Sequence, residues 1–136
     1  MKLLAIDFGE RRTGVAVSDD LGITAQGLNT IVVDDVADIP GRLNEIVVAR
    51  KVDRIILGLP LNMNGTESEM SEKVREFAVG LEAVTSCPVV LWDERMTSLQ
   101  AERVLQELEI KTEGNKEEID RIAATLMLQE YMKTIP

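Results

Sequence analysis

Short apolar runs separated by polar turns dominate the first part of the chain, and they predict strands. Lys2 to Phe8 is an apolar run typical of a buried strand, and Thr13 to Asp19 is a second run of small and branched residues. The link between them, GERR, is too short for a parallel crossover and therefore predicts an antiparallel hairpin. A third strand is expected from about Ile23 to Val33, after turn residues at Asp20 to Gly22.

The pattern then changes to an alternation of helix and strand. Helices are expected where apolar residues recur every three to four positions, and buried strands where a short run is wholly apolar. Two helix starts have capping-box spacing, and a third has a cap-like asparagine. The expected helices are Val36 to Lys51, about Thr66 to Val84, about Thr97 to Ile110, and Asn115 to about Lys133, and the expected strands are Ile55 to Leu59 and Pro88 to Trp92.

The predicted element order is three strands, helix, strand, helix, strand, helix, helix. A meander of strands followed by right-handed crossovers predicts an α/β fold with a mixed five-stranded sheet flanked by helices, which is the order of ribonuclease H-like domains. The sequence has no internal repeat, low-complexity tract or long linker. Residues 1–136 are therefore expected to form a single domain.

Composition narrows the classes of protein. With 45% hydrophobic and 29% charged residues, the chain has the balance of a globular protein with a sizeable core. No apolar run approaches the roughly 20 residues of a transmembrane helix, and Asp7 interrupts the first run too early for a secretory signal. We therefore expect a cytoplasmic protein that does not associate with membranes.

The residues that are absent limit the chemistry. The chain has no histidine and one cysteine, Cys87, which excludes Ser-His-Asp triads, Cys-His pairs, histidine metal sites and intrachain disulfides. Acid-base chemistry must then rely on carboxylates, lysines, tyrosine or metal-bound water. The net charge of -9 repels nucleic acid at long range, so binding to nucleic acid would need local basic patches or divalent cations.

Acidic residues stand at the ends of three predicted elements. Asp7 ends the first strand, Asp93 and Glu94 follow the last strand, and Asp120 lies near the start of the last helix. If the first strand is central, these ends meet at one edge of the sheet, where open α/β sheets build their sites. Clustered carboxylates repel one another unless they bind protons or cations, and Mg²⁺ (or Mn²⁺) is the expected partner. Two such ions would suit phosphodiester cleavage.

Each acidic residue also has a simpler interpretation. Asp7 can cap its turn, Glu94 can form an ion pair with Arg95, and Asp120 can interact with the N-terminal end of its helix. Arginines accompany every acidic position: Arg11, Arg12, Arg95 and Arg121. They are candidates for phosphate contacts, with ordinary ion pairing as the alternative, although a hairpin tip offers few partners to Arg11 and Arg12.

The turn-rich loop PLNMNGTES offers a weaker candidate for substrate binding. Its Asn-Gly pair favours a tight turn, and the following helix start can present backbone amides to a phosphate. Asn62 and Gly65 are therefore binding candidates, with a well-capped helix start as the alternative. Thr97 and Ser98 are expected to act first as caps and only second as ligands.

Four segments together resemble the YqgF family, which comprises pre-16S rRNA nucleases also described as Holliday junction resolvase-like proteins. They are DFGERRTGVAVSD, GLPLNMNGTES, LWDERMTS and IDRIAATLMLQEY, and they follow one another over almost the whole chain. The resemblance implies a ribonuclease H-like fold similar to that of RuvC-type resolvases. It also implies that Asp7, Glu94 and Asp120 are catalytic metal-binding carboxylates, with Asp93 as a rival ligand to Glu94.

The leading prediction is a metal-dependent endonuclease that processes the 5′ end of precursor 16S rRNA. Branched DNA is the alternative substrate, and ribosomal particles and a homodimer are further partners to test. A second hypothesis is a nucleotide-binding switch, but such proteins bind nucleotide between two domains of this type. A third is a non-catalytic ribosome-assembly factor that keeps the fold.

Overall fold

The computed structural model describes residues 1–97, 99–111 and 115–135. The strands are β1 (Leu3–Asp7), β2 (Arg12–Ser18), β3 (Ala25–Gly27), β4 (Ile31–Val32), β5 (Arg54–Leu59) and β6 (Val89–Asp93). The α-helices are α1 (Ile39–Arg50), α2 (Glu69–Thr85), α3 (Leu99–Lys111) and α4 (Lys116–Met132), and short 3-10 helices are η1 (Val36–Asp38) and η2 (Glu94–Met96). In the described ranges, no helix has both the length and the apolar character needed to cross a bilayer.

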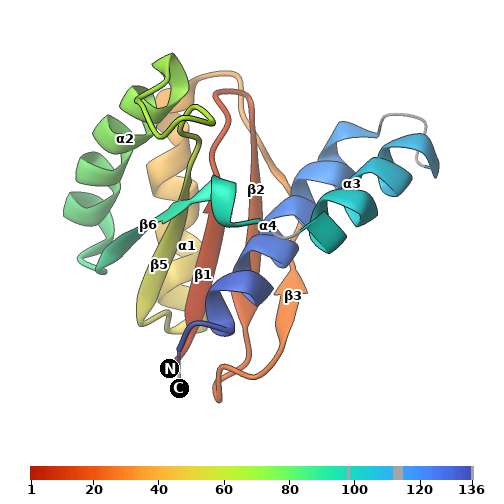
Figure 1. Cartoon of the computed structure of the whole chain (residues 1–136). Coiled ribbons are helices and arrows are strands. Elements are labelled where there is room, and N and C mark those ends of the chain that lie inside the picture. The colour runs from red at the N-terminus through yellow and green to blue at the C-terminus, as the bar shows by residue number, and fades with distance from the viewer. Residues whose placement is uncertain (98, 112–114, 136) are drawn as a thin grey trace.

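The sheet has the order β3-β2-β1-β5-β6, so β1 is central, as expected (Figure 1). β1 pairs antiparallel with β2 and parallel with β5, and β5 pairs parallel with β6. These pairings confirm a mixed sheet of the ribonuclease H-like type. They also place the carboxyl ends of β1, β5 and β6 at the same edge.

The single strand expected from Ile23 to Val33 is wrong, because this segment forms two short strands. β3 pairs with the C-terminal half of β2, and β4 pairs with the N-terminal residues of β2. Gly27 and Asn29 lie at the break, and both residue types are poor strand formers. The chain therefore leaves the ladder between β3 and β4.

Two helix starts also differ from the prediction. α1 begins at Ile39 rather than Val36, because η1 precedes it and Pro40 occupies the first turn, where its missing N–H costs nothing. The cap of α2 is Ser68 rather than Thr66: the Ser68 Oγ accepts from the Ser71 backbone N at 2.9 Å, and the Ser71 Oγ accepts from the Ser68 backbone N at 2.7 Å. Ser98, the other predicted cap beside Thr97, lies outside the described residues.

The two faces of the sheet carry side chains of different size. Large aliphatic residues of β1, β2 and β5 pack beneath α1 and α2: Leu4, Ile6, Val15, Val17, Ile55 and Leu57. The opposite face, which α4 covers, includes the small residues Ala5 and Ala16 and the helix residue Ala124. Figure 1 shows α4 in front of the sheet and α1 behind it.

Glycines bring α4 into backbone contact with the sheet. A Cβ on Gly14 of β2 would collide with the backbone carbonyl oxygen of Asp120 in α4. A Cβ on Gly27 of β3 would lie only 2.7 Å from the Arg121 Cγ. Small residues at these positions therefore determine how closely the helix that carries Asp120 approaches the sheet.

This contact predicts that Gly14→Ala is destabilising. The added methyl group meets backbone rather than a flexible side chain, so the free energy of unfolding should fall by about 2–3 kcal/mol, the upper range for overpacking. Guanidinium titration measures the change. Gly80→Ala in α2 is the control, because a Cβ there meets nothing within 4 Å. It should leave stability equal or raise it by up to about 1 kcal/mol. A Gly14→Ala variant as stable as the wild type would contradict the close packing of α4.

Candidate active site

Strand alternation directs Asp7 toward α4. Leu3 and Ala5 of β1 pack in the cluster under α4, and Asp7 follows them in the same period of two at the carboxyl end of the strand. On the other face, Phe8 stacks on Phe77 of α2, with ring centroids 4.3 Å apart. The buried residues of β1 before Asp7 and the stacked ring of Phe8 after it therefore fix the position of the Asp7 backbone.

The same alternation separates Asp93 from Glu94. Val90 and Trp92 of β6 pack in the cluster under α4, so Asp93, the next residue, points to the other face. Glu94 follows in η2 and returns to the side of α4. The structure thus brings Glu94, and not Asp93, to Asp7.

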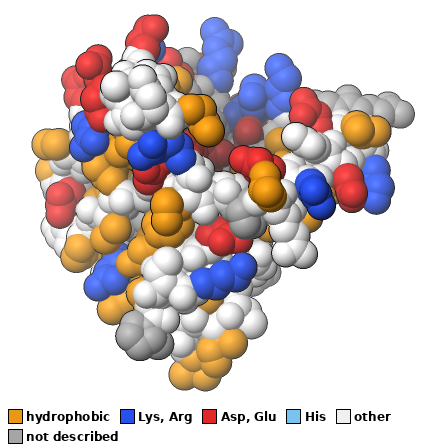
Figure 2. All heavy atoms as spheres, in the orientation of Figure 1, with side chains coloured by type: hydrophobic (Ala, Val, Ile, Leu, Met, Phe, Trp, Pro, Cys, Tyr) orange, Lys and Arg blue, Asp and Glu red, His pale blue; other side chains and the backbone are white. Residues whose placement is uncertain are grey.

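Asp7 and Glu94 share a hydrogen bond between their side chains. They line a cavity of about 210 Å³ with Thr97, and its other walls are apolar side chains of α3 and α4: Leu105, Ala123, Leu126 and Met127. Gly58 of β5 makes room for the glutamate, because a Cβ there would lie 2.8 Å from the Glu94 Oε1. Figure 2 shows acidic side chains in the depression between the surface over α2 and the projecting α3.

Burial raises the pKa of both carboxyl groups. The pKa of Asp7 rises to about 6, first because of desolvation and then because of the charge of Asp120, although the hydrogen bond with Glu94 lowers it. The pKa of Glu94 rises to about 7, first through desolvation and then through the charge of Asp7 and the hydrogen bond to it. Without a cation, the pair therefore holds a proton near neutral pH.

Asp120 belongs to the same region but is bound to an arginine. Its Oδ2 accepts a hydrogen bond from the Arg12 Nε at 2.9 Å, so Arg12 forms the ordinary ion pair that its place at the hairpin disfavoured. The reason is the packing of α4, which brings Asp120 over β2, where Arg12 begins the strand. In the described part of the chain, no three acidic side chains form a ready metal-binding group.

Asp93 binds Arg95 in a bidentate ion pair. Its carboxylate accepts from the Arg95 Nη2 at 2.7 Å, from the Nε at 3.1 Å and from the backbone N at 2.9 Å. This pairing keeps the pKa of Asp93 below its ordinary value. Arg95 also donates to the Met63 carbonyl at 3.3 Å and lies against Gly65, where a Cβ would be 3.2 Å from the guanidinium. Asp93 and Arg95 therefore join the end of β6 to the loop of residues 60–68.

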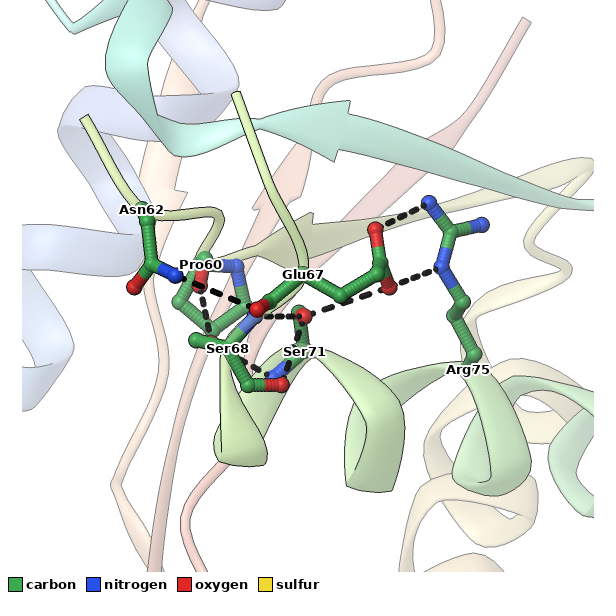
Figure 3. Close-up of polar contacts among 6 residues, drawn as sticks. All are labelled: Pro60, Asn62, Glu67, Ser68, Ser71 and Arg75. Carbon is green, nitrogen blue, oxygen red and sulfur yellow. Dashed lines mark hydrogen bonds and ion pairs between the residues drawn. The ribbon is translucent and has the colours of Figure 1, made fainter. Parts of the chain in front are cut away.

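Internal hydrogen bonds order that loop (Figure 3). The Asn62 amide donates to the Thr66 Oγ1 at 3.0 Å and to the Glu67 carbonyl at 3.1 Å. The Ser68 Oγ donates to the Pro60 carbonyl at 2.6 Å. The Gly65 backbone N donates to the Asn62 carbonyl at 2.8 Å, and Gly65 has a φ of 87°, which suits glycine. Asn62 thus uses its amide within the loop.

The remaining candidates lie around the carboxylates. Arg11 is exposed at the β1–β2 hairpin. Arg121 lies over Gly27 of β3, on the side of α4 away from β5. Gly14 and Gly58 lie inside two of the four motifs but have no predicted role, yet they allow Asp120 and Glu94 to approach. The available signal was a glycine inside a predicted strand, which often marks close approach of another group.

A comparison with family models matches residues 1–134 to RuvX, a family described as Holliday junction resolvase. The chain belongs to the RuvX family. RuvX is another name for YqgF, so the resemblance of the four motifs is confirmed. A relative from Koribacter versatilis is 44% identical over 132 residues, which cover 97% of this chain and 86% of the relative. One from Listeria monocytogenes serovar 1/2a is 43% identical over 136 residues, covering 98% and 99%. Both are named "Putative pre-16S rRNA nuclease".

Solved structures that resemble this fold include RuvC bound to a Holliday junction substrate and a viral Holliday junction resolvase. RuvC of Thermus thermophilus in complex with a Holliday junction substrate has a TM-score of 0.62 and 17% identity, covering 98% of this RuvX chain and 95% of RuvC. The fowlpox virus resolvase has a TM-score of 0.57 and 15% identity, covering 99% and 100%. At these identities the likeness establishes the fold alone, and it confirms the ribonuclease H-like architecture.

The raised pKa values predict an unusual pH dependence of stability. With divalent cations removed, the folded state keeps protons on Asp7 and Glu94 that the unfolded chain has released, so stability should fall as pH rises from about 4 to about 7. Asp7→Asn should therefore be more stable than the wild type at pH 8, by about 2 kcal/mol, and similar to it at pH 4.

Denaturant unfolding between pH 4 and 8 in the presence of EDTA measures this difference. Asp34→Asn is the control, because Asp34 is exposed and solvent keeps its charge hydrated. Two results would contradict this prediction: a wild type whose stability rises from pH 4 to 7, or an Asp7→Asn variant that is less stable than the wild type at pH 8. Either would show that ionisation of Asp7 and Glu94 does not destabilise the folded state.

Proposed function

We propose that this RuvX protein is a divalent-metal-dependent endonuclease that hydrolyses phosphodiester bonds, with the 5′ end of precursor 16S rRNA as its main substrate. The observation that carries the proposal is the meeting of Asp7 and Glu94, from distant parts of the chain, beside Asp120. Membership of a family described as resolvases, and relatives named as rRNA nucleases, support it. Precursor rRNA follows from the names of the relatives, and branched DNA from the family description.

The residues present fit a divalent cation. Mg²⁺ and Mn²⁺ prefer oxygen ligands, and Asp7 and Glu94 form a buried acidic pair that is relieved either by a proton or by a cation. Asp120 can add a third carboxylate if it exchanges its bond to Arg12 for one to the cation. When bound, the metal ion stabilises charge on the phosphate and lowers the pKa of a bound water.

The other side chains have supporting roles in this proposal. Arg12, once released from Asp120, binds a substrate phosphate, and Arg11 adds a second contact at the hairpin. Asp93 holds Arg95 in place, so Arg95 positions the loop of residues 60–68 and presents its guanidinium to the substrate. Gly65 permits this approach, and Asn62 keeps the turn in shape. The apolar walls of the cavity exclude water from the far side of the carboxylates.

Cleavage of two labelled substrates tests the proposal. A precursor 16S rRNA 5′ fragment and a four-way DNA junction are incubated side by side with Mg²⁺, Mn²⁺ or EDTA. The wild type should cut the RNA only with metal, and Asp7→Asn should lower the rate by at least about 10²-fold, because a metal ion contributes several kcal/mol to the barrier. Asp34→Asn should retain the activity.

Each other outcome changes the assignment. Metal-dependent cutting of the junction alone would make this a resolvase, for which symmetric cleavage requires a dimer. Full activity of Asp7→Asn would refute the carboxylate mechanism. Absence of cutting of both substrates, combined with co-purification with ribosomal particles, would favour the assembly-factor alternative.

Metal binding separates the roles of Asp93 and Glu94. Trp92 is the only tryptophan and lies two residues before Glu94, so paramagnetic Mn²⁺ bound at the carboxylates should quench its fluorescence. Glu94→Gln should weaken the apparent Mn²⁺ affinity by more than about tenfold, since even changes outside the ligand shell cost about 10- to 100-fold. Asp93→Asn should weaken it less. A larger effect of Asp93→Asn than of Glu94→Gln would reverse the proposed assignment.

A further inference from the structure

A second hollow lies at the outer edge of the sheet, away from the carboxylates. It has a volume of about 480 Å³ and lies between β3, α1 and α4, which in Figure 1 are the edge strand, the helix behind the sheet and the helix in front of it. Its polar lining includes Gln26, Asn29, Arg42, Glu45, Arg50 and Arg121. We call this hollow the edge groove.

The edge groove is basic in an acidic protein. Three arginines face one glutamate there, whereas the whole chain has a net charge of -9. Arg42 and Arg50 are exposed, and within the described residues neither makes an ion pair with a carboxylate within 4.0 Å. Arg121, the third arginine of the groove, forms a long ion pair with Glu118, in which the Nη1 lies 4.0 Å from the Oε2. The groove therefore offers two guanidinium groups, those of Arg42 and Arg50, that can bind an anion without breaking an ion pair to a described carboxylate.

The spacing of these groups fits an extended polyanion better than a single small anion. Arg42 and Arg50 lie eight residues apart on one face of α1, which is about 12 Å along the helix axis. A nucleic-acid strand carries one charge per about 3.4 Å of helix axis, so the two arginines can contact different phosphates of one strand. The amides of Gln26 and Asn29 add hydrogen-bonding groups suited to phosphate and sugar oxygens.

The groove connects with the carboxylate site through the start of α4. Arg121 lines the edge groove and also a neighbouring hollow of about 260 Å³, where Glu117 and Glu118 lie beside it. Arg121 directly follows Asp120, whose carboxylate is bonded to Arg12. On the other side of Arg42, a hollow with Asp34 and Asp38 is acidic and repels phosphate. Both neighbouring hollows are acidic, so the basic surface is confined to the edge groove, and Arg121 joins it to the start of α4 beside Asp120.

We propose that the edge groove binds the phosphate backbone of the nucleic-acid substrate on one flank of the cleaved bond. This inference rests on the proposed nuclease function and adds a binding surface to it. The groove contacts backbone rather than bases, so it contributes affinity without sequence preference. It also explains how a chain with strong negative charge holds a polyanion: the contact is confined to a local basic surface.

The test is the salt dependence of RNA binding. Arg42→Gln/Arg50→Gln keeps good helix formers in α1. The control, Lys51→Gln/Lys133→Gln, removes the same charge at exposed positions outside the groove. All proteins carry Asp7→Asn so that the probe stays intact, and thermal melting checks their folding. Fluorescence anisotropy with a labelled precursor 16S rRNA 5′ fragment gives the Kd between about 50 and 200 mM salt.

The groove variant should bind more weakly, and the slope of log K against log salt should decrease in magnitude by about 1.5 to 2, for two lost phosphate contacts. The control should keep the slope of the parent. Equal slopes for the groove variant and the control, or no RNA binding by the Asp7→Asn protein, would contradict the proposal that the edge groove binds RNA. Cleavage of the same RNA by the protein that keeps Asp7 is measured in parallel. If this protein does not cut the RNA but the groove variant still shows a smaller salt slope, the nuclease assignment is refuted and the RNA-binding groove is supported.

Discussion

The close contact between α4 and the small-residue face of the sheet is the constraint on which the site depends. Gly14 lets the helix backbone contact β2 directly, Gly27 makes room for the Arg121 and Thr125 side chains over β3, and Ala124 fills the space beneath the helix. Because of this contact, Asp120 lies close enough for its charge to act on Asp7. A bulkier face would move the helix outward and separate acidic residues that are more than 100 positions apart in the chain.

This packing creates an electrostatic problem that the protein solves with a proton and an arginine. Asp7 and Glu94 share a hydrogen bond, and Asp120 forms an ion pair with Arg12. In the proposed function both arrangements are exchangeable: a divalent cation replaces the proton, and a substrate phosphate takes Arg12 from Asp120. The protein thus keeps its acidic groups together without a cation, while the aromatic contacts of Phe8 with Phe77 and of Trp92 with Tyr131 stabilise the two strand ends.

Local sequence patterns account for the strands, the main helices and the carboxyl edge, because these depend on periodicity and turn chemistry. Asp7 could be placed at that edge from its position after an apolar run. The choice between Asp93 and Glu94 depends on strand register, in which a shift of one residue reverses the face. The pair of Arg12 with Asp120 spans 108 positions and depends on the helix contact at Gly14, which no local pattern encodes. The third predicted strand forms β3 and β4 because the two segments pair with opposite ends of β2, which is likewise a long-range contact.

We propose that Asp7 and Glu94 hold a divalent cation with the help of Asp120. The most direct measurement is the anomalous difference map of a crystal of the protein soaked in Mn²⁺. We expect a peak bonded to oxygens of both Asp7 and Glu94, with the hydrogen bond between them lost and the Asp120 side chain turned away from Arg12. A map in which Mn²⁺ binds elsewhere, or in which the Asp7–Glu94 bond persists at saturating Mn²⁺, would contradict it.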